Sequence, residues 1–162
     1  MHGIALDDYR WYIDHALDAM MAIVVDLGDD ANVQPDLPGA NSPYVILTHC
    51  LGVMAYWGGR MIAGRPIVRD RPAEFTASGT VAELARRVAI ARSNLDADIA
   101  NVDPTAAPAH PPDPEDTDLP LGRTQGGVLL HIYEELSQHL GQMELTRDII
   151  RATRRDGPQA SP

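Results

Sequence analysis

The chain has 162 residues, of which 44% are hydrophobic and 22% charged, a composition typical of one globular domain. Its 13 basic and 23 acidic residues give a net charge of −10, which disfavours binding to the phosphate backbone of nucleic acids. No apolar stretch approaches the roughly 20 residues that span a bilayer, and the single cysteine, Cys50, excludes an internal disulfide. The N-terminus lacks a signal-peptide pattern. We therefore expect a cytoplasmic protein that binds neither nucleic acid nor membranes.

The first helix is predicted over residues 7–27, where apolar residues recur at helical spacing. Asp7 is the expected N-cap, and Gly28 the expected stop. Residues 29–41 contain two prolines, a glycine and two asparagines, and this composition predicts a loop.

The second helix is predicted to begin at residues 41–43, where a polar cap precedes a proline. It continues to about Met61. Gly58 and Gly59 near its end would let another backbone come close. Residues 64–78 are expected to form a linker.

Two more helices are predicted in the second half of the chain. Thr80 and Glu83 have the spacing of a capping box at the start of a helix that ends near residue 99. The last helix is expected over residues 124–154. Between them, residues 103–122 hold six prolines, five acidic residues and no lysine or arginine, which excludes a helix. The segment is either a lid or wrap across the surface or a mobile acidic excursion.

These segments predict an all-α fold, an antiparallel four-helix bundle with a long Pro-rich acidic connection before the last helix. Residues 1–155 would form a single bundle domain. Residues 156–162 would form a disordered tail.

Polar residues on the apolar faces of two predicted helices form the candidate site. Glu135 and His139 lie one turn apart beside core positions, and a carboxylate and an imidazole so spaced can bind one divalent ion; otherwise they are a Glu–His pair at the bundle rim. His49 lies among apolar residues and needs a polar partner. It is either a core histidine bonded to a backbone carbonyl or, if it faces the last helix, a third ligand. Three protein ligands with open positions are typical of a catalytic metal site.

Neighbouring residues have other interpretations. Cys50 lies about 100° around the helix from His49, and we interpret it as a small buried hydrophobe. His131 lies about 12 Å before His139 along the helix axis, so it could hydrogen-bond near the site but is too far away to ligate. The arginines around the linker could bind an anionic group, but scattered solvated side chains are the simpler interpretation of Arg60, Arg65, Arg69 and Arg71. No lysine is present, which excludes Schiff-base catalysis.

Residues 41–49 resemble the second helix of the DinB-like metalloprotein superfamily, and residues 131–142 resemble its last helix. Many members carry His-x3-His in that last helix, whereas Glu135 occupies the first of the two positions here. The His, Glu, His set is similar to that of the actinobacterial branch containing mycothiol-dependent maleylpyruvate isomerase and the mycothiol S-transferases.

The resemblance implies a divalent metal, zinc in the first place and nickel as an alternative, held by His49, Glu135 and His139, with catalysis through that metal. A low-molecular-weight thiol, mycothiol by resemblance, would be activated for attack on an electrophile such as an alkyl halide, an epoxide or an activated alkene, because metal coordination deprotonates a thiol. The isomerase has an additional C-terminal domain that contributes to its active site, so a stand-alone transferase fits this chain better. The resemblance also implies a homodimer.

Two further hypotheses stay open. The same metal site could serve a hydrolase in which Glu134 or His131 acts as the base towards a metal-bound water. The chain could instead be a non-enzymatic dimeric stress or interaction bundle. In that case it would pair through an apolar face of the first helix that includes Met21 and Val25.

Overall fold

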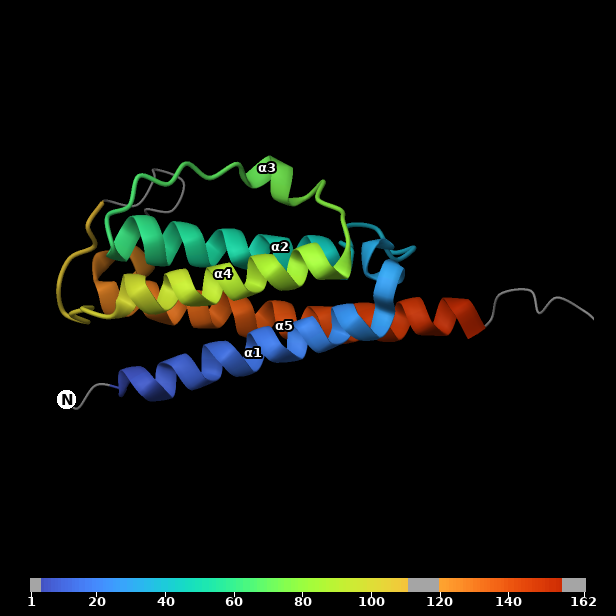
Figure 1. The fold of residues 1–162 in the computed structure, drawn as a ribbon, viewed down its shortest axis with the longest axis horizontal. Helices are drawn as coiled ribbons and strands as arrows, with labels where there is room; N and C mark the ends of the chain where they lie inside the picture. The colour runs from blue at the N-terminus through green and yellow to red at the C-terminus, as the bar shows by residue number, and fades with distance from the viewer. Residues whose placement is uncertain (1–3, 111–119, 156–162) are drawn as a thin grey trace, which may run out of the picture.

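The computed structural model describes residues 4–110 and 120–155, and all regular structure in these ranges is helical. The bundle consists of α1 (Leu6–Leu27), α2 (Pro43–Val53) with its π-helical continuation η2 (Met54–Ile62), α4 (Val81–Ile99) and α5 (Gln125–Arg155) (Figure 1). Short turns of helix occupy the connections: η1 (Gly28–Asn32), α3 (Arg71–Glu74) and η4 (Pro120–Arg123). The predicted all-α bundle is confirmed. The predicted tail at 156–162 lies outside the described residues, and the assignment of 1–155 to one domain stays a prediction.

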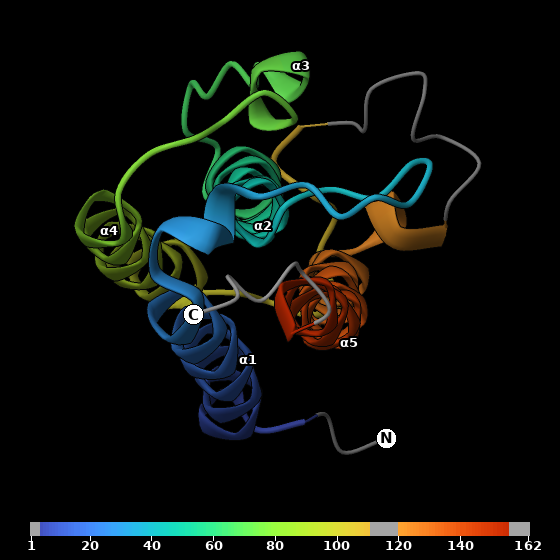
Figure 2. The ribbon, with the colours of Figure 1, turned by 90° about the vertical axis from the view of Figure 1, so that its right-hand side faces the viewer.

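The four long helices lie at the corners of a square when the bundle is viewed along its axis (Figure 2). Tyr12 meets Tyr133 and Asp26 pairs with Arg151, so α1 and α5 run in the same direction. The helices α2 and α4 likewise run together, in the opposite direction (Figure 1). The predicted antiparallel packing therefore holds between these two pairs, while the helices within each pair are parallel.

The linker between η2 and α4 explains this order of directions. It returns over the outside of α2 along the length of the bundle and carries α3 above that helix (Figures 1 and 2). The Pro-rich connection, in contrast, joins neighbouring ends of α4 and α5 (Figure 1). Its described start is tied to the bundle, since Ala109 N–H donates to the Met61 carbonyl and Gln125 N–H donates to the Ala106 carbonyl.

The helix starts follow the sequence signals at two of three sites. The Ser42 side chain accepts a hydrogen bond from Val45 N–H at the start of α2, and Thr80 and Glu83 form the predicted capping box of α4. The prediction for Asp7 was wrong, because α1 begins one residue earlier and Ala5 caps it without a side-chain hydrogen bond.

The two glycines of η2 make room for side chains, not for a backbone as predicted. A Cβ on Gly58 would lie 2.6 Å from Leu95 Cδ1, and one on Gly59 would lie 2.4 Å from Ile67 Cδ1. Both glycines therefore let the linker and α4 pack closely against η2.

The core is formed by one face of α1, α4 and α5 and by nearly the whole circumference of α2 and η2. Because α2 is covered on one side by α5 and on the other by α4 and the linker, it is buried from Pro43 to Leu51. In the described part of the chain, no helix is long and apolar enough to cross a membrane.

Candidate metal centre

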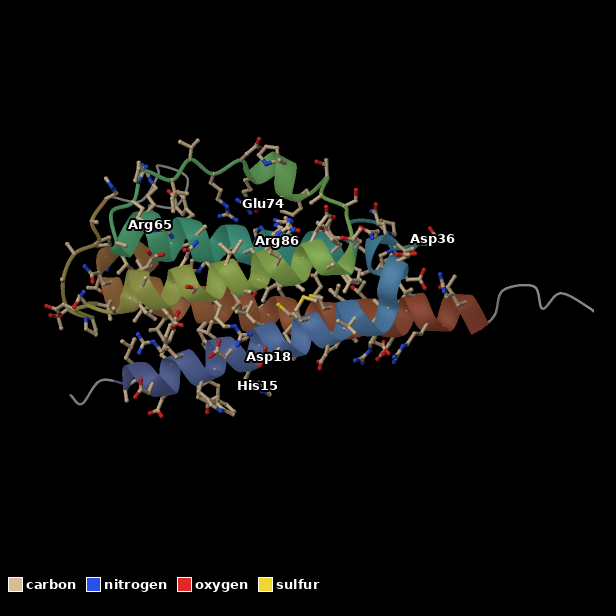
Figure 3. The ribbon with its side chains drawn as sticks, viewed as in Figure 1. His15, Asp18, Asp36, Arg65, Glu74 and Arg86 are labelled. Carbon is tan, nitrogen blue, oxygen red and sulfur yellow. The ribbon has the colours of Figure 1, made fainter. Side chains whose placement is uncertain are left out.

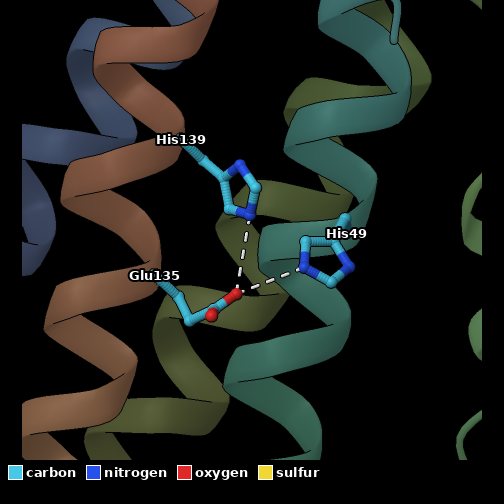
Figure 4. Close-up of side chains that lie close together, drawn as sticks. All are labelled: His49, Glu135 and His139. Atoms are coloured by element: carbon cyan, nitrogen blue, oxygen red, sulfur yellow. Dashed lines mark hydrogen bonds and ion pairs between the residues drawn. The ribbon is translucent and has the colours of Figure 1, made fainter. Parts of the chain in front are cut away.

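His49 lies in the middle of α2 and faces α5 (Figure 4). Only 5% of the residue is exposed, and both ring nitrogens have partners. The Nδ1 atom lies 2.8 Å from Glu74 Oε2, and the Nε2 atom lies 3.2 Å from Glu135 Oε2. His49 is therefore not the core histidine bonded to a backbone carbonyl that the sequence left open.

Glu135 and His139 lie one turn apart on α5, and both side chains point to His49 (Figure 4). His139 Nε2 is 3.5 Å from Glu135 Oε2, and the two imidazole rings have their centroids 5.0 Å apart at 84°. One potential ligand atom from each of the three residues lies within 4.8 Å of the others. The structure thus brings together the three residues that the sequence singled out.

The ring nitrogens that point away from this cluster are held by acceptors. His139 Nδ1 lies 2.8 Å from Gln142 Oε1, just as His49 Nδ1 lies against Glu74. A neutral imidazole whose Nδ1–H donates to an acceptor keeps its Nε2 lone pair free, and this outer hydrogen bond is usual for metal-binding histidines. Two Nε2 atoms and a carboxylate oxygen form a donor set that suits zinc and neighbouring divalent ions. These residues therefore fit the metal that the resemblance implies.

The three side chains also change one another's protonation. The contacts with His139 and then His49 hold the pKa of the Glu135 carboxyl well below its usual range, despite partial burial. Burial alone lowers the pKa of His49, but hydrogen bonds with Glu135 and Glu74 outweigh it and leave the pKa raised. Without a metal, these shifts favour a protonated His49 beside an ionised Glu135, so protons compete with a metal ion for the His49 lone pair.

Comparison with known proteins agrees with this geometry. The family model described as mycothiol-S-transferase (MST) matches residues 8–152. The chain belongs to this family. The match confirms the predicted resemblance to the mycothiol S-transferase branch of the DinB-like proteins. No curated protein and no solved structure matches the chain.

The sequence analysis of this mycothiol S-transferase family member missed one residue of the site, Glu74. It ends α3, which interrupts the linker predicted for 64–78, and its carboxylate is buried against His49. A signal for this helix was present, because Asp70 caps it with a side-chain hydrogen bond to Ala73 N–H and Pro72 follows two residues later. The start of α2 carries a similar signal, although Pro43 there follows the Ser42 cap directly.

The linker arginines are not scattered solvated side chains, so that interpretation was wrong for two of them. Arg69 donates two hydrogen bonds to Glu74, at 2.7 and 2.9 Å. Arg65 donates two to Asp98 on α4, at 2.8 and 2.6 Å. Arg65 therefore ties the linker to α4, whereas Arg69 holds Glu74 within the linker, and Glu74 contacts His49 on α2.

The remaining candidates lie near the cluster without joining it. His131 is buried and its ring meets Trp57 edge-on with centroids 4.6 Å apart, while its Nε2 is 4.0 Å from Glu135 Oε1, too far for a hydrogen bond. Cys50 is fully buried, and burial raises the pKa of its thiol, as expected for a small hydrophobe. Glu134 is exposed and accepts a hydrogen bond from Gln138.

Proposed function

We propose that this chain is a metal-dependent thiol S-transferase whose His49, Glu135 and His139 hold one divalent ion. The single observation that carries the proposal is the convergence of one ligand atom from each residue within 4.8 Å, on a chain that belongs to the mycothiol S-transferase family. The proposed ion is zinc, with nickel as the alternative, and the proposed thiol is mycothiol.

Three protein ligands would leave at least one coordination position for a substrate atom, as in catalytic rather than structural zinc sites. When bound, a zinc ion makes a coordinated thiol lose its proton near neutral pH. The chain's own task is to hold the donor set: Glu74 and Gln142 fix the two imidazoles, and Glu135 supplies the negative charge.

The proposed reaction joins the sulfur of the thiol to an electrophilic carbon, with loss of a leaving group or opening of a strained ring. The protein has one thiol of its own, and this Cys50 is fully buried with a raised pKa, so it is a poor nucleophile. This supports a mechanism in which the reacting sulfur belongs to a small cosubstrate. The proposed partners are therefore a small-molecule thiol and an electrophile.

A homodimer is part of this proposal. Apolar and aromatic side chains are exposed along the outer sides of α1 and α5: Trp11, Tyr12, Val25, Leu130, Tyr133 and Leu145. Tyr12 and Tyr133 contact each other across the two helices, with ring centroids 5.8 Å apart. Val25 belongs to the face of the first helix that the sequence suggested for pairing, whereas Met21 is partly buried against the core.

The test combines metal content with turnover. Elemental analysis of wild type and of His49→Ala, both purified without a metal-affinity tag, should give about one zinc or similar ion per wild-type chain and none in the variant. The wild type should then transfer mycothiol to a chromogenic alkyl halide, and His49→Ala and His139→Ala should lose this activity while keeping their helicity. Transfer at the wild-type rate by both variants would refute the proposal.

The same assay separates the two other hypotheses. A hydrolase would turn over esters or amides without any added thiol. A non-enzymatic bundle would carry no metal even after incubation with excess zinc, and its stability would not respond to zinc.

A further inference from the structure

We propose that Glu74 is a positioning residue of the metal centre, whose carboxylate holds His49 in the tautomer with Nε2 free for the ion. The inference rests on the proposed function, because it concerns the same three ligands. Glu74 itself does not face the ligand cluster, since it lies on the opposite side of the His49 ring.

The contact between the two residues determines which nitrogen carries the proton. His49 Nδ1 lies 2.8 Å from Glu74 Oε2, and a carboxylate can only accept. Nε2 also faces a carboxylate, and Arg69 Nη2 lies 3.3 Å from Nδ1, so it is the shorter contact with Glu74 that favours the proton of a neutral His49 on Nδ1. The lone pair is then on Nε2, which lies 3.2 Å from Glu135 Oε2, on the side of the cluster.

The fold holds this carboxylate from several directions. Arg69 donates to both of its oxygens, from Nε to Oε1 at 2.7 Å and from Nη2 to Oε2 at 2.9 Å. Figure 3 shows Glu74 between α3 and α2, pointing towards α2. Phe75 directly follows α3, and its ring packs against the His49 ring at a tilt of 32°, with centroids 5.4 Å apart. The short helix α3 therefore places a fixed acceptor and a ring on the imidazole.

A glycine in α2 provides the space for the carboxylate. A Cβ added to Gly52 would lie 2.1 Å from Glu74 Oε1 and 2.7 Å from its carboxyl carbon. Any other residue at this position would push Glu74 away from His49. A glycine in the middle of a helix is less stable than an alanine there. The close approach of Glu74 explains why position 52 is nevertheless a glycine.

A purely structural role predicts something different. The Arg69–Glu74 pair lies within the linker and would then only fasten it to α2 through the contact of Glu74 with His49, as Arg65–Asp98 fastens it to α4. These two pairs are well matched, because each is bidentate and the carboxylate side chains are 9% and 5% exposed. In the described part of the chain Asp98 contacts none of the three ligands, so Asp98→Asn is the control for loss of a linker contact.

The test measures zinc affinity of the full chain by competition with a chelator. Glu74→Ala should bind zinc about 10- to 100-fold more weakly, the range found when outer partners of metal ligands are removed. Glu74→Gln should lose less, because its amide oxygen can still accept from Nδ1–H. Gly52→Ala should resemble Glu74→Ala although it keeps the carboxylate. Asp98→Asn should bind zinc as the wild type does, and circular dichroism checks that all variants are folded.

A second readout does not depend on metal. In metal-free protein with ¹⁵N-labelled histidine, at a pH where His49 is neutral, nuclear magnetic resonance should find the proton on Nδ1 in the wild type and a shift towards Nε2 in Glu74→Ala. The proton on Nε2 in the wild type, wild-type zinc affinity in Glu74→Ala, or an equal loss in Asp98→Asn would each overturn the inference.

Thiol transfer is measured separately, so the two proposals can fail independently. If the wild type binds zinc but transfers no thiol, the proposed function is refuted, and the zinc affinities of the variants still decide the role of Glu74. Wild type that transfers thiol while Glu74→Ala binds zinc normally removes only the role of Glu74.

Discussion

Zinc should stabilise the fold through the three-residue cluster, by an amount that can be calculated. His49 and Glu135 are separated by 86 positions in the chain and meet only when α2 packs against α5. The folded state is therefore the one that presents the complete donor set. A ligand that binds only the folded state at 100 times its Kd stabilises it by about 2.7 kcal/mol. For a chain of this length each kcal/mol is worth about 2–4 °C in Tm, so the melting temperature should rise by about 5–11 °C.

Removing one ligand should remove most of this shift. If His139→Ala weakens zinc binding 100-fold, the same zinc concentration stabilises by RT ln 2, about 0.4 kcal/mol, or about 1–2 °C. The assay is a thermal melt followed by circular dichroism, with and without zinc, so that each variant is compared with its own zinc-free baseline. His15→Ala is the matched control, because this histidine is exposed on α1 away from the cluster and points out from the bundle (Figure 3).

Two results would refute this reasoning. An equal zinc shift in wild type and His139→Ala would mean that the ion binds elsewhere. No shift in the wild type at any zinc concentration would mean that the cluster does not hold an ion and that its short distances serve the fold alone.

Three further predictions concern the metal-free protein. Because the pKa of Glu135 is lowered, this residue stabilises the fold above pH 4.5, its ordinary pKa, and the contribution is lost as the pH falls. Because the pKa of His49 is raised, this residue stabilises the fold below pH 6.5, its ordinary pKa, and the contribution is lost as the pH rises. Urea melts should therefore show the greatest stability between these two pH values, and a stability that climbs from pH 6 to 9 would contradict this. Gly58→Ala should lower the free energy of unfolding by about 1–3 kcal/mol through overpacking. Gly141→Ala should raise it by about 0.5–1 kcal/mol, because the added Cβ would meet nothing within 4 Å. Denaturant titration of both variants checks the two signs. Cys50 should react with a thiol reagent only on unfolding, and rapid labelling of the native protein would show that the thiol is accessible.

Local signals in the sequence determined the helices and two of their caps. The starts of α2 and α4 depend on hydrogen bonds between residues three positions apart, and Ser42 and Thr80 with Glu83 carry them in the sequence itself. The spacing of Glu135 and His139 is equally local, because one helical turn places them side by side. His49 could be singled out because a polar residue in such an apolar segment needs a partner.

Tertiary structure decided what no spacing could reveal. Which side of α2 faces α5, and hence whether His49 meets Glu135, depends on the packing of helices far apart in the chain. Glu74 reaches His49 only because the linker returns over α2 and Gly52 leaves space for the carboxylate. No spacing of residues in the sequence indicates either feature. The parallel pairing of α2 with α4 follows from the same return of the chain. Local hydrogen bonds are specified by neighbouring residues, whereas these contacts depend on the free energy of the whole bundle.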